Sequence, residues 1–132
     1  MKRIIIDTNF LMIPYSFKID IFSEFHRICN FNYKLFIFEQ SINELRNIIE
    51  KQSGKHKKAA KLALKLIKSK KISLINSENK NVDTLILENL SNNSIVATQD
   101  AALKHRILEK GISVITLRQK KYLVLIERKL YK

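Results

Sequence analysis

The sequence Ile-Ile-Ile-Asp-Thr-Asn at residues 4–9 decides which fold this chain can adopt. Three consecutive β-branched apolar residues are typical of a strand buried on both faces, and Asp-Thr-Asn is turn and helix-capping chemistry. The pattern predicts a short buried strand that ends at Asp7. In an open α/β sheet, ligands bind at the carboxyl ends of the strands, so we expect Asp7 to lie at the mouth of such a crevice.

A second acid follows a second strand pattern. Residues 95–100 read Ile-Val-Ala-Thr-Gln-Asp, which repeats the order of apolar strand, polar turn and acid. The chain contains only four aspartates, and Asp7 and Asp100 are the two that end a predicted strand. If the two strands are neighbours in the sheet, at a topological switch point, the carboxylates also become neighbours. The alternative is that both aspartates serve only as N-caps of the helices that follow.

Elsewhere, short apolar runs alternate with amphipathic segments. Strands are predicted at residues 4–6, 35–38, 72–75, 95–97 and 114–117, and helices over 17–29, from Ser41 to Gly54, over 55–71, over 82–90 and between Asp100 and Gly111. Ser41 and Glu44 have the spacing of a capping box. Residues 122–126 are ambiguous and could add a strand. The alternation predicts one α/β domain over residues 1–132, an α/β/α sandwich with a mainly parallel five-stranded sheet.

The charge of the chain indicates a polyanionic partner. Lys and Arg number 25 against 12 Asp and Glu, which gives a net charge of +13. This excess favours nucleic acid first and an anionic membrane surface second; the alternative is that it reflects only a Lys- and Ile-rich composition of the genome. Cys29 is the only cysteine, so an internal disulfide is excluded, and no run approaches the roughly 20 apolar residues of a membrane span. We therefore expect a cytoplasmic protein.

Two basic segments are candidates for RNA contacts. Lys58, Lys61 and Lys65 fall on one face of the predicted helix over residues 55–71. The alternatives for this face are that it is merely solvated or that it lies on a membrane surface. The second candidate is the basic tail, in which Tyr122 and Tyr131 are interleaved: Arg118, Lys120 and Lys121 are followed by Tyr122, whose ring could stack on a base.

Two more acids can reach the crevice of Asp7 and Asp100. Glu44 lies near the start of the helix after the second strand, and Asp83 near the start of the helix before the fourth. Four crowded carboxylates repel one another unless a cation lies between them, and oxygen ligands suit Mg²⁺ or Mn²⁺.

Such a metal site on a basic protein is suited to phosphodiester hydrolysis, with Asn9 and Thr98 available to orient a water or a ligand carboxylate. The only glycines, Gly54 and Gly111, form no phosphate-binding loop, which argues against a nucleotide-binding protein.

The ordered set of motifs resembles the PIN-domain ribonucleases. The matching motifs run through nearly the whole chain: Asp7-Thr8-Asn9, Glu44-Leu45, Val82-Asp83 and Ala97-Thr98-Gln99-Asp100. The chain is most similar to the small stand-alone PIN proteins grouped with VapC-type toxins and with the PIN nucleases of ribosomal RNA processing. The resemblance implies strand order 3-2-1-4-5, Mg²⁺- or Mn²⁺-dependent cleavage of single-stranded RNA, frequent homodimers and, for a toxin, a cognate antitoxin protein.

The same resemblance implies that Asp7, Glu44, Asp83 and Asp100 form the catalytic and metal-binding cluster. The chain departs from the pattern at Thr84, where relatives often have a second Asp, and at Gln99, where they often have Asn. These departures leave open a fifth acidic ligand and a second metal. The alternative function is a catalytically silent PIN-like protein that binds RNA or assists ribosome assembly.

Overall fold

The computed structural model describes residues 1–127, so Tyr131 lies outside the described residues. Its elements, in chain order, are β1 (Lys2–Ile6), η1 (Thr8–Met12), α1 (Ile13–Phe17), α2 (Ile21–Ile28), β2 (Tyr33–Phe38), α3 (Glu39–Lys51), α4 (Gly54–Ser69), β3 (Ser73–Ile75), α5 (Val82–Glu88), β4 (Ser94–Ala97), α6 (Ala101–Glu109), β5 (Ser113–Arg118) and β6 (Tyr122–Ile126). The predicted α/β alternation is confirmed.

The described sheet has six strands in the order β3-β2-β1-β4-β5-β6. The prediction of five strands is therefore wrong by one, although the order of the first five is confirmed. The added strand, β6, pairs antiparallel with β5, and all other pairings are parallel. Gln119 and Lys120 both have positive φ in the connection, which lets a tight turn reverse the chain. β6 thus extends the parallel sheet by a hairpin.

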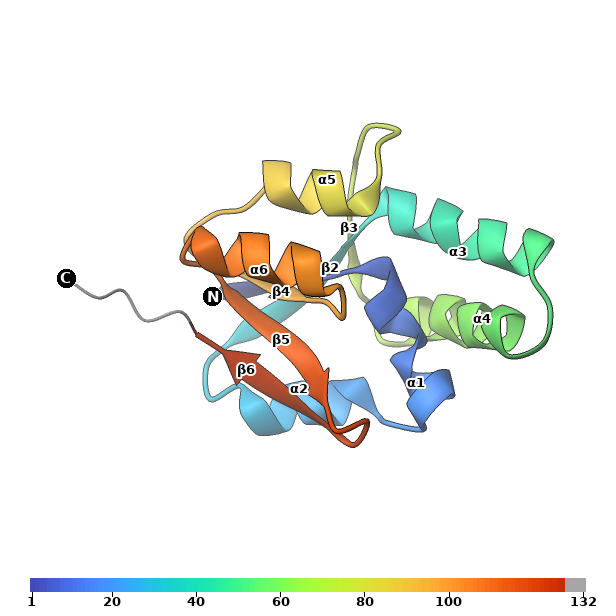
Figure 1. Ribbon diagram of the computed structural model, residues 1–132, viewed down its shortest axis with the longest axis horizontal. Helices are drawn as coiled ribbons and strands as arrows, with labels where there is room; N and C mark the ends of the chain where they lie inside the picture. The colour runs from blue at the N-terminus through green and yellow to red at the C-terminus, as the bar shows by residue number, and fades with distance from the viewer. Residues whose placement is uncertain (128–132) are drawn as a thin grey trace.

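The central strand β1 is buried on both faces, as its composition predicts. Ile4 and Ile6 belong to one core, together with Phe25 of α2 and Ala63 of α4. Ile5 belongs to the core on the other face, which is formed with α5 and α6. Figure 1 shows these layers, with α5 and α6 above the sheet and α2 below it.

Several local predictions are wrong. α3 begins at Glu39 directly after β2, so Ser41 lies inside the helix and the predicted capping box does not form. Gly54 begins α4 instead of ending α3, which stops at Lys51. The helix predicted over residues 17–29 is shorter, because the Asp20 carboxylate accepts hydrogen bonds from the Phe22 and Ser23 N–H groups and starts α2 there.

An ion pair attaches β6 to α2. Glu24 and Arg27 bond to each other at 2.8 Å, and both reach the backbone of Leu123. Glu24 accepts from the Leu123 N–H at 2.9 Å, and Arg27 donates to the Leu123 carbonyl at 3.0 Å. The pair therefore satisfies backbone groups of a strand that would otherwise be an open edge. The hydrogen bond from the Arg27 guanidinium is the main cause that lowers the pKa of Glu24.

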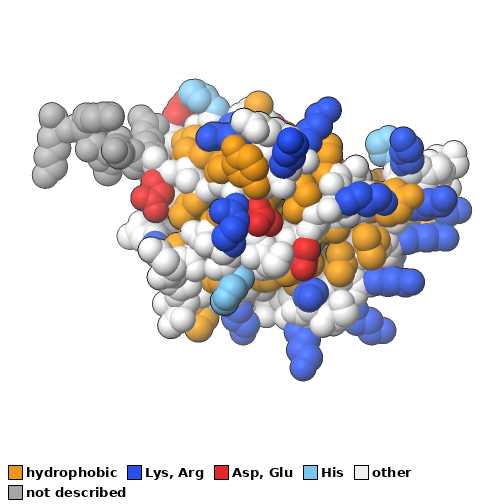
Figure 2. Space-filling view, turned by 90° about the horizontal axis from the view of Figure 1, so that it is seen from below, with side chains coloured by type: hydrophobic (Ala, Val, Ile, Leu, Met, Phe, Trp, Pro, Cys, Tyr) orange, Lys and Arg blue, Asp and Glu red, His pale blue; other side chains and the backbone are white. Residues whose placement is uncertain are grey.

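The surface is rich in positive charge. Figure 2 shows Lys and Arg side chains scattered over the lower face and gathered toward its right, the side on which α4 lies in Figure 1. Among residues 1–127, no helix combines the length and apolar character that a membrane crossing requires.

Candidate active site

Asp7 and Thr98 meet because β1 and β4 are neighbours in register. Ile6 pairs with Ala97, so the next residue of each strand leaves the sheet at the same place. The Asp7 N–H donates to the Ala97 carbonyl at 2.9 Å, and Thr98 Oγ1 donates to Asp7 Oδ2 at the same distance. Asp7 is only 7% exposed and Thr98 is fully buried. A carboxylate is thus held beneath the surface at the carboxyl edge of the sheet.

A hydroxyl network connects this strand end to α3. Thr8 Oγ1 donates a short hydrogen bond of 2.6 Å to Glu44 Oε1 and lies 2.9 Å from Ser41 Oγ. Ser41 is completely buried. The second oxygen, Glu44 Oε2, accepts only a long bond of 3.4 Å from the N–H of Val82, the first residue of α5. Glu44 is therefore held by Thr8 on one side and by Val82 on the other, and Oε2 is the oxygen with the weaker hydrogen bond.

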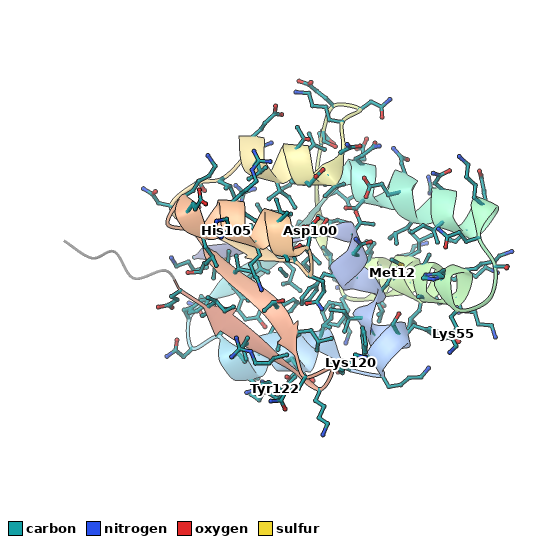
Figure 3. All side chains as sticks on the ribbon, in the orientation of Figure 1. Met12, Lys55, Asp100, His105, Lys120 and Tyr122 are labelled. Atoms are coloured by element: carbon teal, nitrogen blue, oxygen red, sulfur yellow. The ribbon has the colours of Figure 1, made fainter. Side chains whose placement is uncertain are left out.

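Asp100 reaches the crevice from the start of α6. Asp100 Oδ1 accepts from the Leu103 N–H at 3.0 Å, and the Asp100 N–H donates to Thr98 Oγ1 at 3.1 Å. Thr98 Oγ1 therefore donates to the carboxylate of Asp7 and accepts from the backbone N–H of Asp100. Both aspartates also cap the helices that follow them, because Asp7 Oδ1 accepts from the Thr8 N–H and Asp100 Oδ1 from the Leu103 N–H. Figure 3 places Asp100 near the middle of the molecule in that view.

Three carboxylates interact electrostatically. Burial raises the pKa of Asp7, hydrogen bonds from Thr98 and Thr8 oppose that shift, and the charges of Glu44 and Asp100 raise the pKa further. Asp83 is not among the groups that shift it. The Asp83 side chain is exposed and accepts from the Thr84 N–H at 3.0 Å, although its backbone neighbour Val82 contacts Glu44. Glu44 and Asp100 are therefore each near enough for their charge to act on Asp7, whereas Asp83 is exposed and does not.

The chemistry of these donors fits a hard cation. Within residues 1–127, no three His, Cys, Asp or Glu side chains are close enough to hold a metal ion as they stand. Mg²⁺, however, needs only one or two carboxylates, because it keeps several waters and takes phosphate oxygens as further ligands. A cation would also relieve the repulsion that Glu44 and Asp100 exert on Asp7. The residues present therefore fit a site completed by water and substrate.

The two polar neighbours of the acids differ in role. Gln99 Oε1 accepts from Thr116 Oγ1 at 2.9 Å and from the Leu117 N–H at 2.7 Å. Gln99 thus attaches the loop that carries Asp100 to β5. Asn9 is exposed in η1, and its side chain has no hydrogen-bond partner in the described part of the chain.

The predicted basic residues lie outside the crevice. Lys58, Lys61 and Lys65 are exposed on α4 and form no salt bridge within the described range. Arg118 ends β5, which runs parallel to β4, so it lies at the same edge of the sheet as Asp100. Lys120 follows in the exposed turn, and Figure 3 places it and Tyr122 at this hairpin. Lys121 is exposed in the same turn.

Sequence reasoning missed the roles of Thr8 and Ser41. Thr8 was expected only as part of a turn, and Ser41 as a helix cap. The available signal was the spacing of Ser41 and Glu44, because residues three apart on a helix share one face. Two polar side chains on a face that also carries the buried Leu45 indicate a buried polar partner, which is Thr8.

Comparisons with known proteins identify the family of the chain. The sequence model of a family described as PIN like domain matches residues 4–120. Ribonuclease VapC4 of Methanocaldococcus jannaschii is 36% identical over 126 residues, which cover 92% of this chain and 95% of that protein. Ribonuclease VapC9 of Archaeoglobus fulgidus is 30% identical over 118 residues, covering 89% and 84%.

Solved structures support the fold. The PIN domain endonuclease Utp24 superposes with a TM-score of 0.78 at 22% identity, over 97% of this chain and 92% of that one. A domain of a functionally unknown protein from Methanocaldococcus jannaschii superposes with a TM-score of 0.56 at 15% identity, over 100% and 98%.

Proposed function

The chain belongs to the PIN-like domain family, and from this premise we propose that it is an Mg²⁺- or Mn²⁺-dependent endoribonuclease that hydrolyses single-stranded RNA. The observation that carries the proposal is the burial of Asp7 beside Glu44 and Asp100. This arrangement raises the pKa of a carboxylate and so costs stability at neutral pH, which a purely structural N-cap does not require. The ribonucleases at 36% and 30% identity support the same activity.

In this proposal Asp7, Glu44 and Asp100 would supply the carboxylates of the metal site, one or two of them directly and the rest through the waters of the metal, and Asp83 would contribute from the rim. A bound cation supplies neutralisation of charge on the phosphate and activation of water for attack. The hydroxyl side chains of the protein position the carboxylates. Thr98 fixes Asp7, and the Thr8 hydroxyl fixes Glu44 so that Oε2 remains available to a ligand.

Asp100 is oriented by its bond to the Leu103 N–H, which leaves its other oxygen without a partner within residues 1–127. Asn9, exposed one residue after Thr8, is proposed to orient a water at the mouth. Together these residues would present carboxylate oxygens to a metal ion, which in turn would bind the phosphate.

The proposed substrate and partners follow from the positive charge of the surface and from the relatives of the chain. RNA phosphates contact Lys58, Lys61 and Lys65 on α4 and Arg118, Lys120 and Lys121 at the β5–β6 hairpin. The VapC relatives support a toxin-type nuclease with a cognate antitoxin. We further propose that it acts in the cytoplasm as a homodimer. An RNA-processing nuclease of the same chemistry would have the same site but no antitoxin.

The test is cleavage of a labelled single-stranded RNA by purified protein. We expect cleavage with Mg²⁺ or Mn²⁺, none in EDTA, and recovery when the metal is restored. A melting curve gives a readout that is independent of activity, because a metal that binds the folded state raises the melting temperature by mass action. Equal cleavage in EDTA would refute metal dependence, and metal-loaded protein that binds RNA without cutting it would favour the catalytically silent alternative.

A further inference from the structure

A hollow of about 290 Å³ extends from Glu44 along α3. Its lining residues all come from this helix: Gln40, Asn43, Glu44, Arg46, Asn47 and Glu50. Gln40, Asn43 and Asn47 lie on one face with Glu44, because helical residues three, four and seven apart are neighbours. Since Glu44 bonds to Thr8, which follows Asp7, the hollow begins at the proposed active site. A substrate group at the Glu44 end of this hollow would lie beside the proposed metal site.

The side chains of the hollow suit an uncharged ligand. Apart from Glu44, which belongs to the proposed metal site, the lining holds one carboxylate, Glu50, and one guanidinium, Arg46, so it has no net positive charge to attract a phosphate group. The pocket beside α1 is opposite in character, because it is lined by Lys18 and Lys55 without any acid. The remaining groups on α3 are amides, which donate and accept hydrogen bonds without carrying charge.

Two of these amides are already arranged as a pair. Asn43 Nδ2 donates to Gln40 Oε1 at 3.0 Å. The bond leaves Gln40 Nε2 as a donor and Asn43 Oδ1 as an acceptor. Asn43 is exposed and Gln40 half-buried, so both groups can meet a ligand. A donor beside an acceptor is complementary to the edge of a nucleobase, and Asn and Gln amides pair best with adenine.

We infer that this hollow holds one unpaired base of the RNA next to the cleaved phosphate, with adenine as the preferred base, read by Gln40 and Asn43. The inference rests on the proposed ribonuclease activity and adds a specificity to it. Bases of single-stranded RNA are free to be read on their hydrogen-bonding edges, which agrees with a site open to solvent on a helix face. Gln40 and Asn43 are specificity residues here and have no part in the bond cleavage itself.

The test is cleavage of a random-sequence single-stranded RNA pool, with the cut ends sequenced. Wild-type protein should favour adenine at one position adjacent to the cut, by about tenfold for a two-bond contact. In a Gln40→Ala/Asn43→Ala variant that preference should fall severalfold. Gln52→Ala is the matched control, since Gln52 is an exposed amide just past the other end of α3.

A binding measurement separates this inference from the activity on which it rests. Asp7→Asn protein should bind an adenylate homopolymer more tightly than a uridylate one of equal length, and the added double substitution should remove the difference. An unchanged base preference in the double variant, or equal affinity for both homopolymers, would overturn the adenine site while leaving the nuclease intact. Absence of any RNA cleavage by wild-type protein would instead overturn the proposed function.

Discussion

Thr8 Oγ1 lies 2.6 Å from Glu44 Oε1 and joins residues that are 36 positions apart in the sequence. Because Thr8 follows Asp7 directly, this bond fixes the distance between the end of β1 and the start of α3. Hydrogen bonds to a charged acceptor are short and strong, and those that orient a metal-binding carboxylate tune the whole site. The account therefore predicts that Thr8 matters to activity although it carries no charge.

Thr8→Val should lower the rate of RNA cleavage by roughly 10- to 100-fold, the usual effect of losing a group that orients a metal ligand. The substitution keeps the shape and removes the hydroxyl, so Glu44 loses its short bond and Ser41 loses its partner. Thr8→Ser is the control, since it retains the hydroxyl and should keep most of the rate. Equal rates for Val and Ser would show that the hydroxyl does not position Glu44.

Asp7→Asn should make the folded protein more stable at pH 7 in metal-free buffer. The pKa of Asp7 is raised in the folded state, so ionisation of this group costs stability as pH rises through that pKa. The advantage of the variant should therefore shrink as pH falls through the raised folded pKa and should be lost below the unfolded value of 3.8, where the wild-type group is protonated in both states. Denaturant unfolding across this pH range measures it, and a constant difference would contradict the raised pKa.

Glu24→Gln should loosen β6 and lower the melting temperature at neutral pH. Arg27 lowers the pKa of Glu24, so the stability that this group contributes is present above its ordinary value of 4.5 and is lost as pH falls through the folded pKa. The difference in melting temperature between wild type and variant should therefore disappear at acidic pH. Amide hydrogen exchange at Leu123, whose N–H bonds to Glu24, locates the effect, and unchanged exchange there would contradict it.

Reversal of Lys58, Lys61 and Lys65 to Glu should weaken RNA binding and reduce its salt dependence. Each phosphate contact of single-stranded RNA adds roughly 0.7 to the slope of log K against log salt, so lost contacts flatten the line. A matched control reverses three other exposed lysines, which lie near the amino ends of the strands and so opposite the proposed active site: Lys2, Lys34 and Lys110. If both triple variants bind alike, α4 is an ordinary solvated face and the β5–β6 hairpin becomes the better candidate.

Patterns that depend on neighbours in sequence were sufficient for most of the fold. Ile4, Ile5 and Ile6 indicated a doubly buried strand, and the alternation of elements led to the parallel sheet. β6 was ambiguous because a five-residue apolar run does not distinguish a strand from other buried segments. β6 pairs with β5 in a hairpin, and its other side is held by Glu24 and Arg27, which lie 99 and 96 residues from Leu123 in the sequence.

Part of the set of acidic site residues could also be predicted from local sequence patterns. Asp7 and Asp100 follow strands, so topology alone brings them to one edge. The Ser41 cap failed because β2 runs directly into α3, and the hydroxyl is used by Thr8 instead. Asp83 was placed correctly along the chain, but only side-chain coordinates reveal that its carboxylate bonds to its own helix.

The most direct test of the central claim is the rate of RNA cleavage by Asp7→Asn protein, compared with Asp20→Asn protein at saturating Mg²⁺. Both substitutions remove one negative charge from an N-cap aspartate, and Asn caps a helix about as well as Asp. The account predicts that Asp20→Asn protein cuts at the wild-type rate and that Asp7→Asn protein is folded but inactive. Cleavage by Asp7→Asn at the wild-type rate would contradict the claim that the buried acid at the end of β1 is the centre of a nuclease site.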